Sequence, residues 1–94
     1  MRIRYRRDPD TELPHIYAHD VTQAEVEEAL RQRSEDRAGR DGSRVAIGRT
    51  RAGRVLRVIY VRDVDGDGIF VITAYELRGK ALTAYRRRKR RKPQ

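Results

Sequence analysis

Arginine and tyrosine side chains recur along the part of the chain that is expected to form a β-sheet. Both residue types can make direct contacts with RNA. A guanidinium group binds phosphate through a planar fork, and an aromatic ring stacks on an unpaired base. In RNA cleavage by attack of the 2′-hydroxyl, cations also stabilise the charge that develops on the phosphorane. The alternative is that the tyrosines are core residues with a polar tip and the arginines form a solvated face. The residues concerned are Arg49, Arg54, Arg57, Tyr60, Tyr75, Arg78 and Tyr85.

Two histidines, His15 and His19, are four residues apart and would share one face of a helix. That spacing occurs in metal sites, but no third ligand of a suitable type accompanies them, and Pro14 weakens the case for a regular helix. We favour ordinary surface or packing histidines over a zinc pair. The use of one histidine as a general acid or base near neutral pH stays open.

The segment from Asp63 to Gly68 matches the opening of a calcium loop, D-x-D-x-D-G. The match fails at the twelfth position, where Ala74 stands in place of the required bidentate glutamate. The segment also lies between predicted strands and not between helices. We therefore expect a hairpin turn rich in Asp and Gly.

The net charge of +9 is concentrated at the C-terminal end of the chain. From Leu77 onward there are nine basic residues and no Asp or Glu, so the preceding residues are electrically balanced. Seven of the basic residues are consecutive, from Arg86 to Lys92, and such a run is an electrostatic footprint for a polyphosphate. The run does not distinguish RNA from DNA, and an acidic protein partner would also neutralise it. We divide the chain into one domain at residues 1–85 and a basic extension at residues 86–94.

The composition excludes several classes of protein. The chain has no cysteine, which rules out a disulfide framework, a thiolate metal site and a thiol nucleophile. It has no apolar N-terminal run of the kind that a secretion signal needs, and no apolar stretch long enough to cross a bilayer. We expect a cytoplasmic protein with no membrane partner and no cofactor. Because 94 residues bury only a modest core, any active site should be an open surface cleft.

A capping box predicts the first helix. Thr22 and Glu25 can satisfy each other's backbone amides, while Val21 and Val26 form a hydrophobic staple, so a helix should run from Gln23 to about Arg33. A turn of helix is also possible over residues 15–19.

The remaining pattern predicts an α+β fold, with a small antiparallel β-sheet and helices packed against it. The sheet's third long segment is apolar on both faces and should be central and covered by helices. The residues around Gly39 and Gly42 are expected to form a mobile charged loop. A C-terminal helix should pack on the sheet, with its turns from Arg86 in solvent. The expected strands are an edge strand at residues 2–6 and segments at Arg44–Thr50, Arg54–Val61 and Ile69–Tyr75.

Several of these segments resemble one known family. The run His15–Thr22, followed by Glu25–Leu30, resembles the H-x-x-x-HGV stretch that leads into the first helix of BrnT-type toxins. Gly48–Leu56 is similar to the first hairpin of that family. Val71–Ala74, followed by a helix that contains Tyr85, is similar to its last strand and closing helix. The resemblance covers most of the chain.

The resemblance implies a RelE-like fold and a type II toxin that cleaves RNA without metal, inhibits translation and is silenced by an antitoxin protein. Two positions depart from the family pattern. Asp20 replaces the glycine of HGV, which affects a turn more than the chemistry. Tyr75 replaces an arginine with a plausible phosphate role, which weakens the case for nuclease activity and leaves Tyr75 or Arg78 as its substitute.

This interpretation assigns roles to named side chains. Arg49 and Arg78 would bind the scissile phosphate, His19 would donate or accept a proton, and Tyr75 and Tyr85 would stack or relay protons. A non-catalytic RNA- or ribosome-binding module on the same scaffold is the alternative. A module whose basic tail docks into an acidic antitoxin-like protein is a third possibility. The residues expected to bind RNA are Arg54, Arg57, Arg86, Arg87, Arg88, Lys89, Arg90, Arg91 and Lys92.

Overall fold

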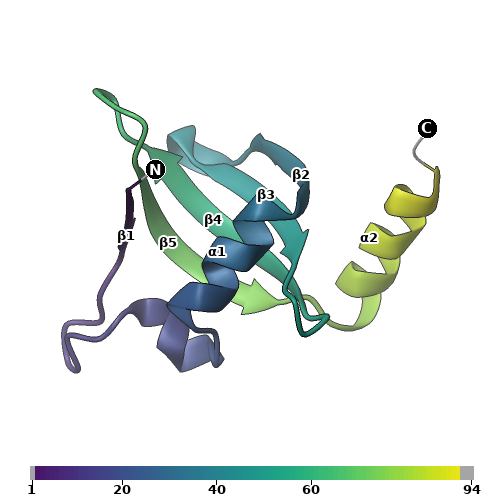
Figure 1. Cartoon of the computed structure of the whole chain (residues 1–94), viewed down its shortest axis with the longest axis horizontal. Coiled ribbons are helices and arrows are strands. Elements are labelled where there is room, and N and C mark those ends of the chain that lie inside the picture. Colours follow the sequence, from purple (N-terminus) through teal and green to yellow (C-terminus); the bar gives the residue numbers. More distant parts are fainter. Residues whose placement is uncertain (1, 92–94) are drawn as a thin grey trace.

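The computed structural model describes residues 2–91, which form one sheet, two α-helices and two short 3₁₀ helices. The sheet order is β1-β5-β4-β3-β2, and α1 lies across one face of it (Figure 1). Helix α2 extends beyond the sheet on the side away from β1 (Figure 1). The elements are β1 (Ile3–Tyr5), η1 (His15–His19), α1 (Gln23–Arg31), β2 (Arg33–Ala38), η2 (Arg40–Gly42), β3 (Arg44–Arg49), β4 (Val55–Arg62), β5 (Ile69–Glu76) and α2 (Gly79–Arg91).

Helix α1 begins as the sequence predicts. The Thr22 side chain accepts a hydrogen bond from the Glu25 amide at 3.1 Å, and the Glu25 carboxylate accepts one from the Thr22 amide at 3.0 Å. Val21 and Val26 are both buried, as a staple requires. The helix ends at Arg31 and not at Arg33, because Arg33 already pairs with Gly48 as the first residue of β2.

The three predicted β segments form an antiparallel meander, β3-β4-β5. The expected turns are confirmed: Thr50 and Gly53 close the first, and the Asp63 amide donates to the Gly68 carbonyl at 2.9 Å in the second. Residues 15–19 form the short helix η1.

Three expectations about the sheet were wrong. The sheet is not purely antiparallel, since β1 runs parallel to β5. The pattern predicts no strand at Arg33–Ala38, but these residues form β2, which pairs with β3. The third segment, β5, lies next to the edge strand, and β4 is the central strand.

Alternation along the strands divides the apolar residues between two clusters on opposite faces. On the α1 face, Val26 and Leu30 pack with Leu56 and Val58 of β4 and with other buried residues of the sheet. The second cluster is smaller and lies on the opposite face, which we call the open face. It consists of Ile47, Val55, Leu77 and Tyr85, with Leu82 against it.

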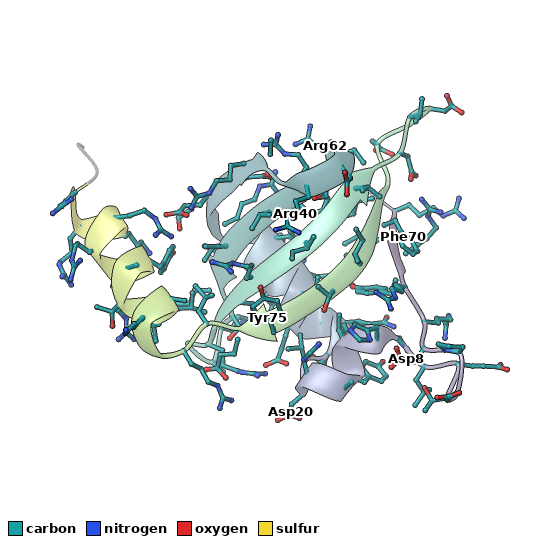
Figure 2. The ribbon with its side chains drawn as sticks, turned by 180° about the vertical axis from the view of Figure 1, so that it is seen from behind. Asp8, Asp20, Arg40, Arg62, Phe70 and Tyr75 are labelled. Carbon is teal, nitrogen blue, oxygen red and sulfur yellow. The ribbon has the colours of Figure 1, made fainter. Side chains whose placement is uncertain are left out.

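The open face is covered only where α2 begins. Tyr85 is the buried residue of α2, whereas Arg86 to Arg91 are exposed. No helix passes in front of β4 and β5 when the molecule is viewed from behind (Figure 2). The expectation that β5 is covered by helices is therefore wrong for this face. Residues 86–91 continue α2, so the boundary drawn at residue 86 falls inside a helix.

Within residues 2–91, no helix is long and apolar enough to cross a membrane.

Gly48 allows α1 to approach the sheet closely, which makes it a test of this packing. A Cβ at Gly48 would lie 1.9 Å from the Ala29 carbonyl oxygen, whereas a Cβ at Gly66 would meet nothing within 4 Å. We expect Gly48→Ala to lower the free energy of unfolding by about 3 kcal/mol, and Gly66→Ala to change it by less than about 0.5 kcal/mol. Urea denaturation measures both. Equal effects would contradict this placement of α1.

Candidate functional site

A histidine, a tyrosine and an arginine meet at one end of the open face. The rings of His19 and Tyr75 have their centroids 6.0 Å apart in an edge-on arrangement. Arg57 donates from its terminal nitrogen to the Tyr75 hydroxyl at 3.3 Å, with its guanidinium carbon 5.9 Å from the ring centroid. Arg57 and Tyr75 are direct partners across β4 and β5, and His19 ends η1 beside them. Figure 2 shows Tyr75 near the end of β5.

Arg57 keeps its charge available. Within residues 2–91 it forms no ion pair, and its Nε is buried without a hydrogen-bond partner. The neighbouring Thr73 hydroxyl is likewise buried and unpaired. Buried polar groups are normally hydrogen-bonded, but this Nε has no exposed surface, so an incoming phosphate oxygen would have to meet the terminal nitrogens of the guanidinium group.

A second histidine extends the group. The His15 and His19 rings are 5.1 Å apart and nearly perpendicular. The Asp8 carboxylate accepts from Nδ1 of His15 at 2.7 Å, and such a bond fixes the tautomer of the ring. Among the described residues, no group of three or more His, Cys, Asp or Glu could hold a metal ion.

Arg54, which we expected to bind RNA, is instead tied into the fold. Its guanidinium donates to Glu25 at 2.8 Å, to Glu76 at 3.2 Å and to the Asp20 carbonyl at 3.0 Å. Asp20 follows His19 and Glu76 follows Tyr75, so Arg54 fixes the backbone next to both side chains. It acts as a positioning residue.

The network shifts two pKa values. Hydrogen bonding to Glu25, together with the charges of Glu25 and Glu76, raises the pKa of Arg54. Partial burial alone would raise the pKa of Glu25, but hydrogen bonds from the Thr22 amide and from Arg54 outweigh it and hold that pKa below its ordinary value.

Arg49 lies on the same face as Arg57. It pairs with Val55 across β3 and β4, which makes Arg57 its diagonal neighbour; such neighbours are roughly 7–8 Å apart. Arg49 is exposed and lines a hollow with Arg86, Lys89 and Arg90 of α2.

The other predicted residues lie elsewhere. Tyr85 is buried, with its hydroxyl 2.5 Å from the Ser34 hydroxyl, and Tyr60 is buried against Asp36 at the same distance. Both therefore match the alternative of core tyrosines with polar tips. Arg78 is 81% exposed and 3.4 Å from Glu76. Arg87 and Arg91 are exposed on α2, and Lys92 lies outside the described residues.

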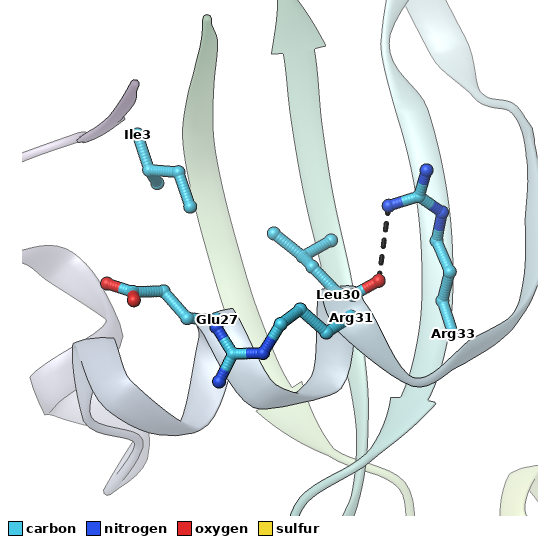
Figure 3. A pocket seen from close by; sticks show the side chains of 5 residues that line it. All are labelled: Ile3, Glu27, Leu30, Arg31 and Arg33. Atoms are coloured by element: carbon cyan, nitrogen blue, oxygen red, sulfur yellow. Dashed lines mark hydrogen bonds between the residues drawn. The ribbon is translucent and has the colours of Figure 1, made fainter. Parts of the chain in front are cut away.

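Another hollow lies on the α1 side, away from this group. It measures about 580 Å³ and lies between β1, α1 and the start of β2, where Arg33 donates to the Leu30 carbonyl at 3.2 Å (Figure 3). Ile3 and Leu30 give it apolar walls, and Glu27 and Arg31 stand at its rim. None of the predicted catalytic residues lines it.

The structure thus brings together His19, Tyr75 and Arg57, with Arg49 nearby, and separates Tyr85 from them. Nothing in the residue types distinguishes Arg57 from Arg54. The useful signal would have been the strand register, because Arg57 faces Tyr75 whereas Arg54 precedes β4. The contact between His15 and Asp8 carries no sequence signal that we could identify.

Comparisons with protein-family models, with curated proteins and with solved structures found no match to this chain.

Glu25→Gln tests the positioning network. Glutamine preserves the capping box but removes the charge that faces Arg54, so we expect about 1.5 kcal/mol less stability at pH 7. The folded pKa of Glu25 is depressed, whereas the unfolded value is about 4.3. The stabilisation that the Glu25 charge gives the folded protein is therefore fully present above the unfolded pKa. It is lost as the pH falls through the lower pKa that Glu25 has in the folded protein. Thermal melts across pH 2–7 should show the two proteins converging at acid pH.

Glu27→Gln is the matched control, because Glu27 lies on the same helix and forms no ion pair within residues 2–91. It should leave stability unchanged to within about 0.5 kcal/mol. A Glu25→Gln protein as stable as the control at pH 7 would exclude a structural role for this pair.

Proposed function

We propose that this protein is a metal-independent endoribonuclease whose centre is His19, Tyr75 and Arg57. The observation that carries the proposal is the meeting of a histidine, a tyrosine and an arginine that forms no ion pair within residues 2–91, on an uncovered sheet face. Those three side chains supply a proton acceptor, a hydroxyl donor and a phosphate ligand. The site is an open surface, which a polymeric substrate can reach.

The reaction that these groups suit is an intramolecular transesterification. His19 takes the proton of the 2′-hydroxyl as its oxygen attacks the adjacent phosphorus. Arg57 stabilises the negative charge that develops on the phosphorane oxygens. The bond to the 5′ oxygen then breaks, and the Tyr75 hydroxyl, which accepts from Arg57, donates the proton that this oxygen needs. The products are a 2′,3′-cyclic phosphate and a 5′-hydroxyl.

The biological role follows from the resemblance to BrnT-type toxins. We assign the protein to a type II toxin–antitoxin system in the cytoplasm, where it would cleave messenger or ribosome-bound RNA and be silenced by a cognate antitoxin. The basic residues at the end of the chain support an RNA substrate, since most nucleic-acid affinity comes from phosphate contacts.

One observation favours the alternative, a non-catalytic RNA-binding module on this scaffold. A general base is usually oriented by a further hydrogen bond. His19 is exposed, and within residues 2–91 its ring takes part in no hydrogen bond, only in ring contacts with His15 and Tyr75. A bound substrate would have to supply the hydrogen bond that orients the His19 ring.

Incubation of the purified protein with total RNA and with translating ribosomes, in EDTA, tests the proposal. We expect cleavage with 2′,3′-cyclic phosphate ends. His19→Ala and Arg57→Gln should each reduce the rate about 100-fold, the lower range for the loss of a general base and of a charge-stabilising donor. Tyr75→Phe should also reduce it about 100-fold, because it removes the proposed proton donor. End-labelled RNA on sequencing gels gives the rates.

Two matched substitutions control for nonspecific effects. Tyr17→Phe changes an exposed tyrosine of η1, and Arg6→Gln removes a charge near β1, and both should keep the wild-type rate. RNA binding without any cleavage would select the non-catalytic module. Cleavage that survives all three active-site substitutions would place the activity elsewhere, or in a contaminant.

A further inference from the structure

Helix α2 and the end of β3 enclose a groove with basic walls. One hollow of about 390 Å³ is lined by Arg49, Arg86, Lys89 and Arg90 over the ring of Tyr85. A second, of about 270 Å³, shares Arg49 and Lys89 with the first and adds Arg51, Gln32 and Thr50. Because the two hollows share these residues, they lie next to each other, and we call them together the α2 groove.

The cations of the α2 groove are not neutralised by carboxylates of the described part of the chain. Arg49, Arg51, Arg86, Lys89 and Arg90 take part in no ion pair within residues 2–91, and no carboxylate lines either hollow. Unpaired like charges from two elements repel one another, so this arrangement costs stability unless an anion occupies the space.

Other contacts hold the groove in shape. Arg88, on the same helix, donates to both oxygens of Glu35 at 2.9 and 3.1 Å, which anchors α2 to β2 and lowers the pKa of Glu35. The Tyr85 hydroxyl meets Ser34, which lies at an irregularity in the register of β2. Arg88 therefore anchors α2, whereas its basic neighbours on that helix remain available to a ligand.

The lining indicates what kind of anion fits. A protein partner needs an apolar anchor at the centre of its interface, but the aromatic ring of the α2 groove belongs to Tyr85, which is 2% exposed. That burial also denies an unpaired base a ring on which to stack. What remains is a cluster of guanidinium and ammonium groups, which bind phosphate oxygens.

We infer that the α2 groove binds the phosphodiester backbone of a nucleic acid without reading its bases. The inference does not depend on the proposed cleavage and holds equally for a protein that binds RNA without cutting it. Through Arg49, the diagonal neighbour of Arg57, the groove adjoins the candidate site on the open face. A strand anchored in the groove would enter that site.

Fluorescence anisotropy with short 2′-O-methyl RNA tests the groove, since such RNA lacks the attacking hydroxyl and cannot be cleaved by the proposed reaction. We expect Arg49→Gln/Lys89→Gln to weaken binding about tenfold or more. The slope of log K against log salt should become shallower by about 1.4, because each phosphate of a single strand that the protein neutralises contributes roughly 0.7 to that slope. Two oligonucleotides of unrelated sequence should show the same decrease in affinity.

The control is Arg2→Gln/Arg6→Gln, which removes the same charge from exposed residues at the opposite edge of the sheet. It should change affinity less than about threefold. Equal decreases in the two double variants would overturn the inference and leave only diffuse attraction. A decrease confined to one oligonucleotide sequence would mean that bases are read. Tighter binding of poly-glutamate than of RNA at the groove would assign it to an acidic protein.

Discussion

The arrangement of the open face depends on the positive charge of one arginine that stands just before β4. Arg54 precedes β4, and its guanidinium binds α1 through Glu25, β5 through Glu76 and the end of η1 through the Asp20 carbonyl. A partly buried cation is favourable only when its donors are satisfied, and here each satisfied donor ties down a different element. Arg54 therefore holds the chain immediately after both His19 and Tyr75.

The sequence predicted the parts of the fold whose stability comes from apolar burial or from local hydrogen bonds. Helix α1 and the meander β3-β4-β5 belong to this class. Strand β2 does not, because Arg33–Ala38 has no apolar alternation. Its pairing is stabilised by polar contacts that exist only after folding: Asp36 accepts from Arg44 at 3.0 Å and from Tyr60. A charged and polar sequence such as that of β2 looks the same in a loop and in a strand.

The kinds of residue in the candidate site were predictable from the sequence. The individual residues that form it were less predictable. The spacing of His15 and His19 indicated that they would share one helical face, and in the structure their rings are 5.1 Å apart. The strand register is needed to tell Arg57, which belongs to the site, from Arg54, which does not. A shift of one position along a strand moves a side chain to the other face of the sheet. Tyr85 has the chemistry of a site residue, but α2 needs an apolar anchor, and its ring supplies it. Burial in the folded protein therefore distinguishes core residues from site residues of the same type, which the amino-acid composition alone does not.

The parallel pairing of β1 with β5 has a consequence for how the protein is made. Ile3 pairs with Ile69, so within residues 2–91 strand β1 has no partner until β5, the last strand of this part of the chain, has been made. Pairings this distant along the chain form slowly, and domains generally fold as units during synthesis. His19 and Tyr75 come together only when β5 has left the ribosome. A nascent chain therefore carries no assembled candidate site until β5 has been synthesised and has emerged.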